Sequence, residues 1–146
     1  MNQTAVQSSL LSDQVELDAR DGNGSTALIL VAYHGHIDAL NLLLQAGADR
    51  NVGDNRGNTA LMGATFRGEE QIARALLAHP RTDPDARNNA GQNAAMFAAL
   101  FGRAAALDAL ASRGTDLGAA DPSGQTPESL ARQQGNEALA GSIAKA

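Results

Sequence analysis

Apolar residues recur along this chain at the spacing of short amphipathic helices. In the clearest stretch two apolar stripes follow one another: first Leu28, Val31 and Ala32, then Leu40, Leu43 and Leu44. Residues three or four apart lie on one face of a helix, so each stripe predicts a helix with one buried side. We expect the first helix to begin after Thr26, a favourable N-cap residue, and the second to span 37–45.

Glycine-rich and polar segments separate these stripes. Gly35 follows the first stripe and Gly47 the second, and glycine after a helix supplies the positive φ at which helices commonly end. A polar stretch at 48–53 then leads into the next glycine-rich turn. The pattern predicts a unit of turn, helix, short turn, helix and extended return.

The same unit recurs along the chain. Three columns of residues hold one period, and their successive members lie 33, 34 and 33 residues apart. The columns are Gly24, Gly57, Gly91 and Gly124; Gly35, Gly68, Gly102 and Gly135; and Thr26, Thr59, Asn93 and Thr126. A fixed period of this length indicates stacked small units, each of which buries its apolar stripes against its neighbours.

We therefore expect one all-α domain over 1–146. Its expected parts are a half-repeat at 1–20, full repeats at 21–53, 54–87 and 88–120, and a polar C-terminal capping repeat at 121–146. In the second repeat, a segment with two prolines, His79 to Asp85, replaces the usual extended return. We expect a locally distorted loop there.

The first full unit resembles the ankyrin repeat. The family pattern is Gly-x-Thr-Pro-Leu-His, then Gly-His, then Leu-Leu-x-x-Gly-Ala-Asp-x-Asn. This chain has GSTALI from Gly24, then Gly35 and His36, then LLLQAGADRN from Leu42. The resemblance covers residues 10–146 and implies a solenoid of helix-turn-helix units joined by β-turn or hairpin loops. The family's histidine is replaced by Ile29, Met62 and Met96, where we expect adaptable apolar packing.

The resemblance also implies where a partner would dock. In ankyrin repeats, partners lie along the concave face, formed by the turn tips and the exposed end of each first helix. Carried over position by position, the helix ends are Tyr33, His34, Phe66, Arg67, Leu100 and Phe101. The tips contribute Asn23, Ser25, Asn55, Arg56, Asn58, Asn89 and Gln92.

Three of the four aromatic residues fall in this one row. The fourth, Phe97, is assigned to the core. Aromatic residues and arginine are the types that most often carry interface energy. We interpret the row as an apolar stripe rimmed by adaptable hydrogen-bonding tips. The alternative is that the rings half-bury against neighbouring repeats and serve only packing.

Composition narrows the choice of partner. The net charge is −5 and the arginines form no basic run, which disfavours nucleic acid and a membrane surface. No apolar stretch approaches the roughly 18 residues needed to span a bilayer. The chain has no cysteine and three histidines, and no set of metal ligands, so we expect no metal and no cofactor.

Catalytic patterns are also missing. No convergent nucleophile, base and orienting group is visible, so an enzyme with a site between repeats is disfavoured. Our leading hypothesis is a monomeric, non-enzymatic module that binds a protein partner on its concave face. Two alternatives stay open: a self-assembling or structural spacer, and a secreted effector that engages a host protein.

Source and compartment are weaker expectations. The bias toward arginine over lysine and the abundant alanine favour a GC-rich bacterial genome. No signal peptide is visible at the start of the chain, so we expect a cytoplasmic protein by default. A periplasmic or secreted location would follow if an upstream signal had been removed.

Overall fold

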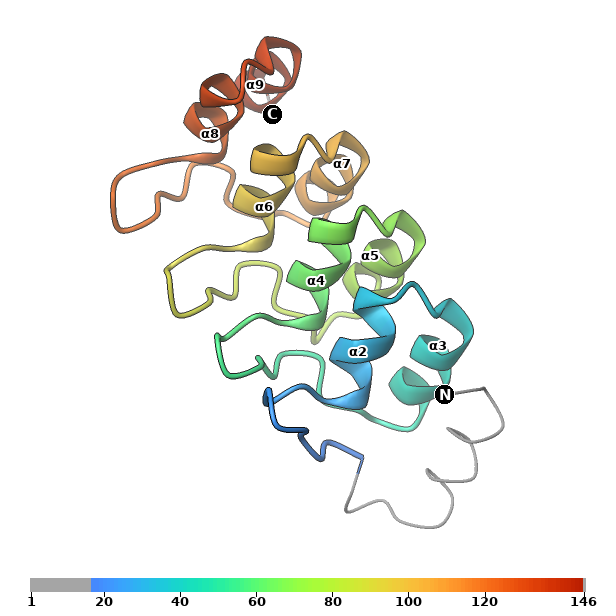
Figure 1. Cartoon of the computed structure of the whole chain (residues 1–146). Coiled ribbons are helices and arrows are strands. Elements are labelled where there is room, and N and C mark those ends of the chain that lie inside the picture. The colour runs from blue at the N-terminus through green and yellow to red at the C-terminus, as the bar shows by residue number, and fades with distance from the viewer. Residues whose placement is uncertain (1–16, 146) are drawn as a thin grey trace.

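The computed structural model describes residues 17–145, and the expected half-repeat at 1–20 lies mostly outside this range. Eight helices occupy the described range and form four helix-turn-helix pairs (Figure 1). The pairs are α2 (Ala27–Tyr33) with α3 (Ile37–Gln45), α4 (Ala60–Arg67) with α5 (Glu70–Leu77), α6 (Ala94–Phe101) with α7 (Ala104–Ser112), and α8 (Pro127–Gln133) with α9 (Glu137–Lys145). The expected all-α solenoid is confirmed.

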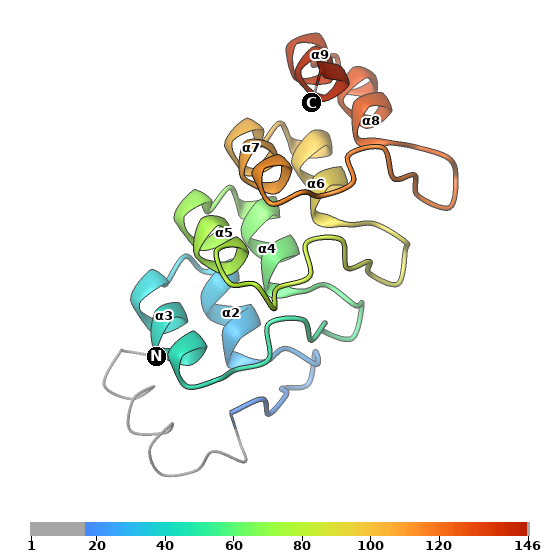
Figure 2. The same ribbon diagram turned by 180° about the vertical axis from the view of Figure 1, so that it is seen from behind.

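The pairs stack into two layers of helices. The first helices α2, α4, α6 and α8 contact one another in order, and behind them α3, α5 and α7 do the same. The long loops between pairs project together from one side of the stack, beside the first-helix layer (Figures 1 and 2). We call the outer turns of these loops, at 21–25, 54–58, 88–92 and 121–125, the tips.

Each first helix begins at the capping residue that the repeat column predicted. The side chains of Thr26, Thr59 and Asn93 accept a hydrogen bond from the backbone N–H three residues later. Such a bond satisfies one of the otherwise unpaired amides of the first turn. Gly68 and Gly102, at φ of 74° and 70°, end α4 and α6 in the left-handed conformation.

The core lies between the two layers and runs through the stack. Its fully buried large side chains include Leu28, Leu40, Ile72, Leu76, Met96 and Leu110. Alanines with no exposed surface fill the remaining space and let the helices approach closely. The residues at the family's histidine position, Ile29, Met62 and Met96, are buried as expected.

The loop at 79–85, which contains the two prolines and is called the second loop, is hydrogen-bonded to the third repeat. The guanidinium of Arg113 donates hydrogen bonds to the carbonyls of His79, Pro80 and Thr82 at 3.2, 2.9 and 2.9 Å. Partial burial lowers the pKa of His79 below its ordinary value, and the charge of nearby arginines lowers it further. The turn also differs from the regular return, because the Thr82 N–H donates to His79 O, whereas the equivalent Ala48 and Thr115 amides donate to Leu43 O and Leu110 O. The loop is thus irregular, as expected, and it is held by Arg113.

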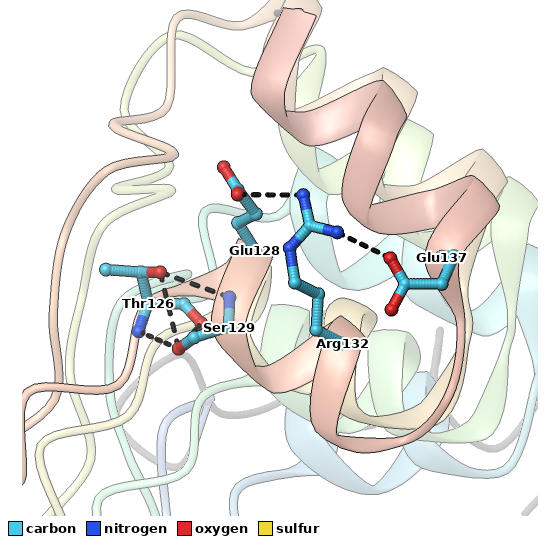
Figure 3. A network of polar contacts seen from close by, with 5 residues as sticks. All are labelled: Thr126, Glu128, Ser129, Arg132 and Glu137. Atoms are coloured by element: carbon cyan, nitrogen blue, oxygen red, sulfur yellow. Dashed lines mark hydrogen bonds and ion pairs between the residues drawn. The ribbon is translucent and has the colours of Figure 1, made fainter.

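The fourth repeat carries polar groups on its outer helices. Figure 3 shows Arg132 between the carboxylates of Glu128 and Glu137, and its bond to Glu128 measures 3.1 Å. Thr126 and Ser129 cap α8 reciprocally, through bonds of 3.2 and 2.8 Å. These exposed ion pairs contribute little stability. They do contribute to a polar surface at the C-terminal end of the stack. A polar surface is what a capping repeat requires, and that role stays a prediction.

Candidate functional site

A groove of about 890 Å³ runs along the exposed side of the first helices, between them and the tips. Its lining comes from the first three repeats, with residues from α2, α4, α6 and the tips beside them. The helices supply apolar side chains and the tips supply amides and charges. Stacking of the repeats thus forms an open groove that has an apolar wall of helices on one side and a polar wall of tips on the other.

A glycine interrupts the apolar floor of this groove. Leu30, Gly63 and Phe97 occupy the same position in successive first helices, and all three line the groove. A Cβ atom built on Gly63 would meet only Tyr33, at 3.7 Å or more. The missing side chain leaves a hollow between its neighbours, bounded also by Tyr33 and Phe66. We call this hollow the Gly63 socket.

Gly63 lies in the middle of α4, where glycine is unfavourable. Relative to alanine it costs a helix interior about 0.5–1 kcal/mol. Nothing on the backbone requires it, because its φ is not in the left-handed region. The space that it leaves is therefore its evident structural effect.

The aromatic rings form a continuous row beside the socket. Tyr33 and Phe66 are stacked with ring centroids 6.3 Å apart, and Phe66 meets the edge of Phe101 at 4.9 Å. These separations are those of favourable aromatic pairs. Tyr33, Phe66 and Phe101 nevertheless remain 36%, 38% and 42% exposed. The rings do pack on one another, yet a large part of each stays open to a partner.

The assignment of Phe97 to the core is wrong. The ring is only half-buried, lines the groove and stacks on Phe101 at 6.4 Å. Met96 and four alanines occupy the buried positions of α6, so position 97 falls on the face shared with Leu30.

Two arginines and one aspartate supply the charge at and beside the groove. Arg56 lines it from the second tip, and the Arg67 guanidinium lies 5.0 Å from the centroid of the Tyr33 ring. Within residues 17–145 the ion pairs are made by Arg74 and Arg132, so neither groove arginine has a carboxylate partner there. Asp54 also lines the groove, but it accepts hydrogen bonds from the Arg56 and Asn58 backbone amides.

Two of the tip asparagines already donate hydrogen bonds within the fold. Asn55 donates through its backbone N–H to Asn23 O, and through its side chain to Gly22 O, at 3.0 and 3.2 Å. Asn89 repeats both bonds one unit later, to Arg56 O and Asn55 O. These side chains join the tips into a ladder, so Asn55 and Asn89 each have a donor already in use. For the other tip residues, the interpretation as adaptable hydrogen-bonders stays a prediction.

Comparison with known proteins identifies the family to which this repeat architecture belongs. A family model for ankyrin repeats in three copies matches residues 2–88 of the chain. The chain belongs to the ankyrin-repeat family. Ankyrin repeats are generally protein–protein interaction modules, and the family is typically non-enzymatic.

Among the curated relatives of this ankyrin-repeat chain are proteins named neurogenic locus notch homolog protein 1. Those of Cricetulus griseus, Mus musculus and Rattus norvegicus are each 35% identical to it over 106 residues. The match covers 73% of this chain but only 4% of each relative. The similarity therefore concerns the repeats alone.

Most of the residues predicted for the ankyrin-repeat surface line the groove. They are Ser25, Tyr33, His34, Asn55, Arg56, Asn58, Phe66, Asn89 and Gln92. Asn23, Arg67, Leu100 and Phe101 lie outside the lining. Of these, Leu100 packs partly against the core, whereas Arg67 and Phe101 extend the row through their contacts with Tyr33 and Phe66. Whether any of these residues binds a partner stays a prediction.

The sequence reasoning missed Leu30, Gly63 and Phe97. The signal was present in the repeat alignment, where these three residues form a column with the spacings of the other columns. A glycine between two large apolar residues in that column indicates a hollow. In the described part of the chain, no cluster of three or more His, Asp or Glu side chains could hold a metal ion, and no helix is long and apolar enough to cross a membrane.

Proposed function

We propose that this ankyrin-repeat protein is a non-enzymatic interaction module that holds part of a partner protein in its groove, on the concave face. The observation that carries the proposal is the open apolar groove itself. In the described chain the large apolar side chains left exposed are Leu30, Tyr33, Phe66 and Phe101, and they gather along one face. A folded chain exposes such a patch at a cost, and patches of this kind mark interaction sites.

The composition of the groove fits a protein partner. Rings and arginines are the residue types that most often anchor protein interfaces. The rings are also held in place before binding, because each packs on its neighbour in the row. Less side-chain freedom is then lost when a partner docks.

The test fills the socket without harming the fold. Gly63→Leu places a leucine where the first repeat already has Leu30, and a Cβ atom built on Gly63 meets only Tyr33, at 3.7 Å or more. Gly141→Leu is the matched control, because Gly141 also lies inside a helix, α9, with nothing within 4 Å of its built Cβ. Both changes replace a helical glycine and should maintain or raise the melting temperature.

The measurement is capture of proteins from an extract of the cells that make this chain, read by mass spectrometry. We expect a protein that is retained by the wild type and by Gly141→Leu but not by Gly63→Leu. Equal retention by both variants would place the binding surface elsewhere. Retention of the chain's own copies in the same pattern would instead favour self-assembly.

A further inference from the structure

Resting on the function proposed above, we infer that the groove selects an extended acidic segment of its partner, with one apolar side chain in the Gly63 socket and a carboxylate on either side. The apolar side chain is the anchor. The carboxylates pair with Arg56 and Arg67.

The first argument is the sign of the charge. The chain carries a net charge of −5, yet the groove presents Arg56, and Arg67 lies beside it on Tyr33. Asp54 also lines the groove and keeps its negative charge, with one oxygen accepting hydrogen bonds from the Arg56 and Asn58 amides. The two arginines outnumber this carboxylate, so an acidic segment is attracted here more than to the rest of a molecule whose net charge is negative.

The second argument is that the two arginines make no polar contact within the described residues. Most other arginines do: Arg20, Arg50, Arg87, Arg103 and Arg113 donate to backbone carbonyls, and Arg74 and Arg132 pair with carboxylates. Among the described residues, Arg56, Arg67 and Arg81 make neither a hydrogen bond from the guanidinium nor an ion pair, and of these three only Arg56 and Arg67 lie at the groove or contact its rings. The Arg67 guanidinium lies over the Tyr33 ring, and the residue is exposed.

The third argument is spacing. Arg67 ends α4 and Arg56 lies in the tip before it, so the two lie on opposite sides of Gly63 along the chain. Gly63 and Arg67 are four residues apart in α4, which is about 6 Å at 1.5 Å per residue. An extended peptide advances about 3.3 Å per residue and directs every second side chain to one side. An acidic residue two positions from the apolar anchor therefore matches Arg67, and a second acidic residue on the other side of the anchor is directed toward Arg56.

The probe is a phage-displayed library of random nine-residue peptides, selected on the full chain and read by sequencing. We expect enrichment of peptides in which Leu, Met or Phe has Asp or Glu two positions away on one side and a further Asp or Glu on the other side. The same library is selected in parallel on Gly63→Leu and on the double variant Arg56→Gln/Arg67→Gln.

The matched control for charge is Arg74→Gln/Arg81→Gln. It changes the net charge of the same repeat by the same amount, but neither side chain lines the groove, as Arg56 does, or lies over the Tyr33 ring, as Arg67 does. A synthetic peptide from the selection should bind roughly tenfold more weakly to the groove double variant, and unchanged to the control. Added salt should weaken binding to the wild type more than to the groove variant.

The possible results test the acidic pattern and the extended segment separately. Enriched peptides that lack acidic residues, or that bind the groove double variant as well as the wild type, would overturn the acidic pattern and leave the proposed function standing. No enrichment on the wild type over Gly63→Leu would overturn the extended segment as occupant. In that case the capture experiment above still decides whether a protein binds the groove.

Discussion

Equivalent positions in successive repeats place different side chains in nearly the same surroundings. Comparing these residues therefore shows what each side chain contributes. Ala48, Thr82 and Thr115 form one such column at the start of the return segment, and all three are buried. Within residues 17–145 the two threonine hydroxyls have no hydrogen-bond partner, whereas the alanine needs none. A buried polar group without a partner is destabilising.

Replacing Thr82 with valine should therefore stabilise the protein. Valine keeps the volume of the side chain and removes the unpaired hydroxyl, and we expect the free energy of unfolding to rise by about 1 kcal/mol. Chemical denaturation of Thr82→Val and of the wild type measures the difference. Thr65→Val is the control, because the Thr65 hydroxyl donates to Leu61 O at 2.8 Å. A loss of stability for Thr82→Val would mean that the hydroxyl is bonded in solution.

At the scale of elements, the hydrogen-bond ladder between the tips joins the first three tips but does not continue to the fourth. In the first two steps, an asparagine at the second position of a tip donates twice to the preceding tip. The fourth tip has Pro122 at that position, which lacks the backbone N–H and an amide side chain. In the described chain, the carbonyls of Asn89 and Ala90 accept no hydrogen bond from the fourth tip. The proline ring still packs against Gly91.

Restoring the missing step should hold the fourth tip more tightly. Pro122→Asn supplies the two donors that Asn55 and Asn89 supply, each worth about 0.5–1.5 kcal/mol, against the about 0.4–1 kcal/mol of chain entropy that proline saves. We expect slower hydrogen exchange at Gly124 and a small rise in melting temperature. The reverse change, Asn89→Pro, should speed exchange at Gly91. Faster exchange at Gly124 in Pro122→Asn would contradict a ladder built by these donors.

The helices could be predicted because their signals are local. The caps at Thr26, Thr59 and Asn93 and the span 37–45 follow from residues within one repeat, and the structure reproduces them. The groove is different, since its floor depends on which face of a helix the neighbouring repeats leave open. Phe97 lies among apolar residues in the sequence, and only the position of α4 against α6 shows that it faces outward.

At the scale of the whole molecule, the main contacts between the described helices join each repeat to its neighbours. The fourth repeat packs through α8 on α6 and has no repeat beyond it within the described chain. Its core side chains are also less completely enclosed: Leu130 and Ile143 are 9% and 7% exposed, and Leu76 in the second repeat 0%. In a stack of this kind, stability is a sum of repeat and interface terms, so it need not be uniform. The groove, which uses the first three repeats, avoids this weaker end.

We therefore expect the fourth repeat to open separately, before the repeats that form the groove. Native-state hydrogen exchange in low denaturant should give smaller opening free energies for the amides of α8 and α9 than for those of α4 and α5.

Leu139→Ala should lower the opening free energies in the fourth repeat and leave those in the second repeat nearly unchanged. Leu76→Ala, the same type of change in the second helix of the second repeat, should cost about 2–5 kcal/mol there because its side chain has no exposed surface. Equal opening free energies in all four repeats would show instead that the stack unfolds as one unit. Any partner in the groove would then stabilise the C-terminal end as much as the repeats that it touches.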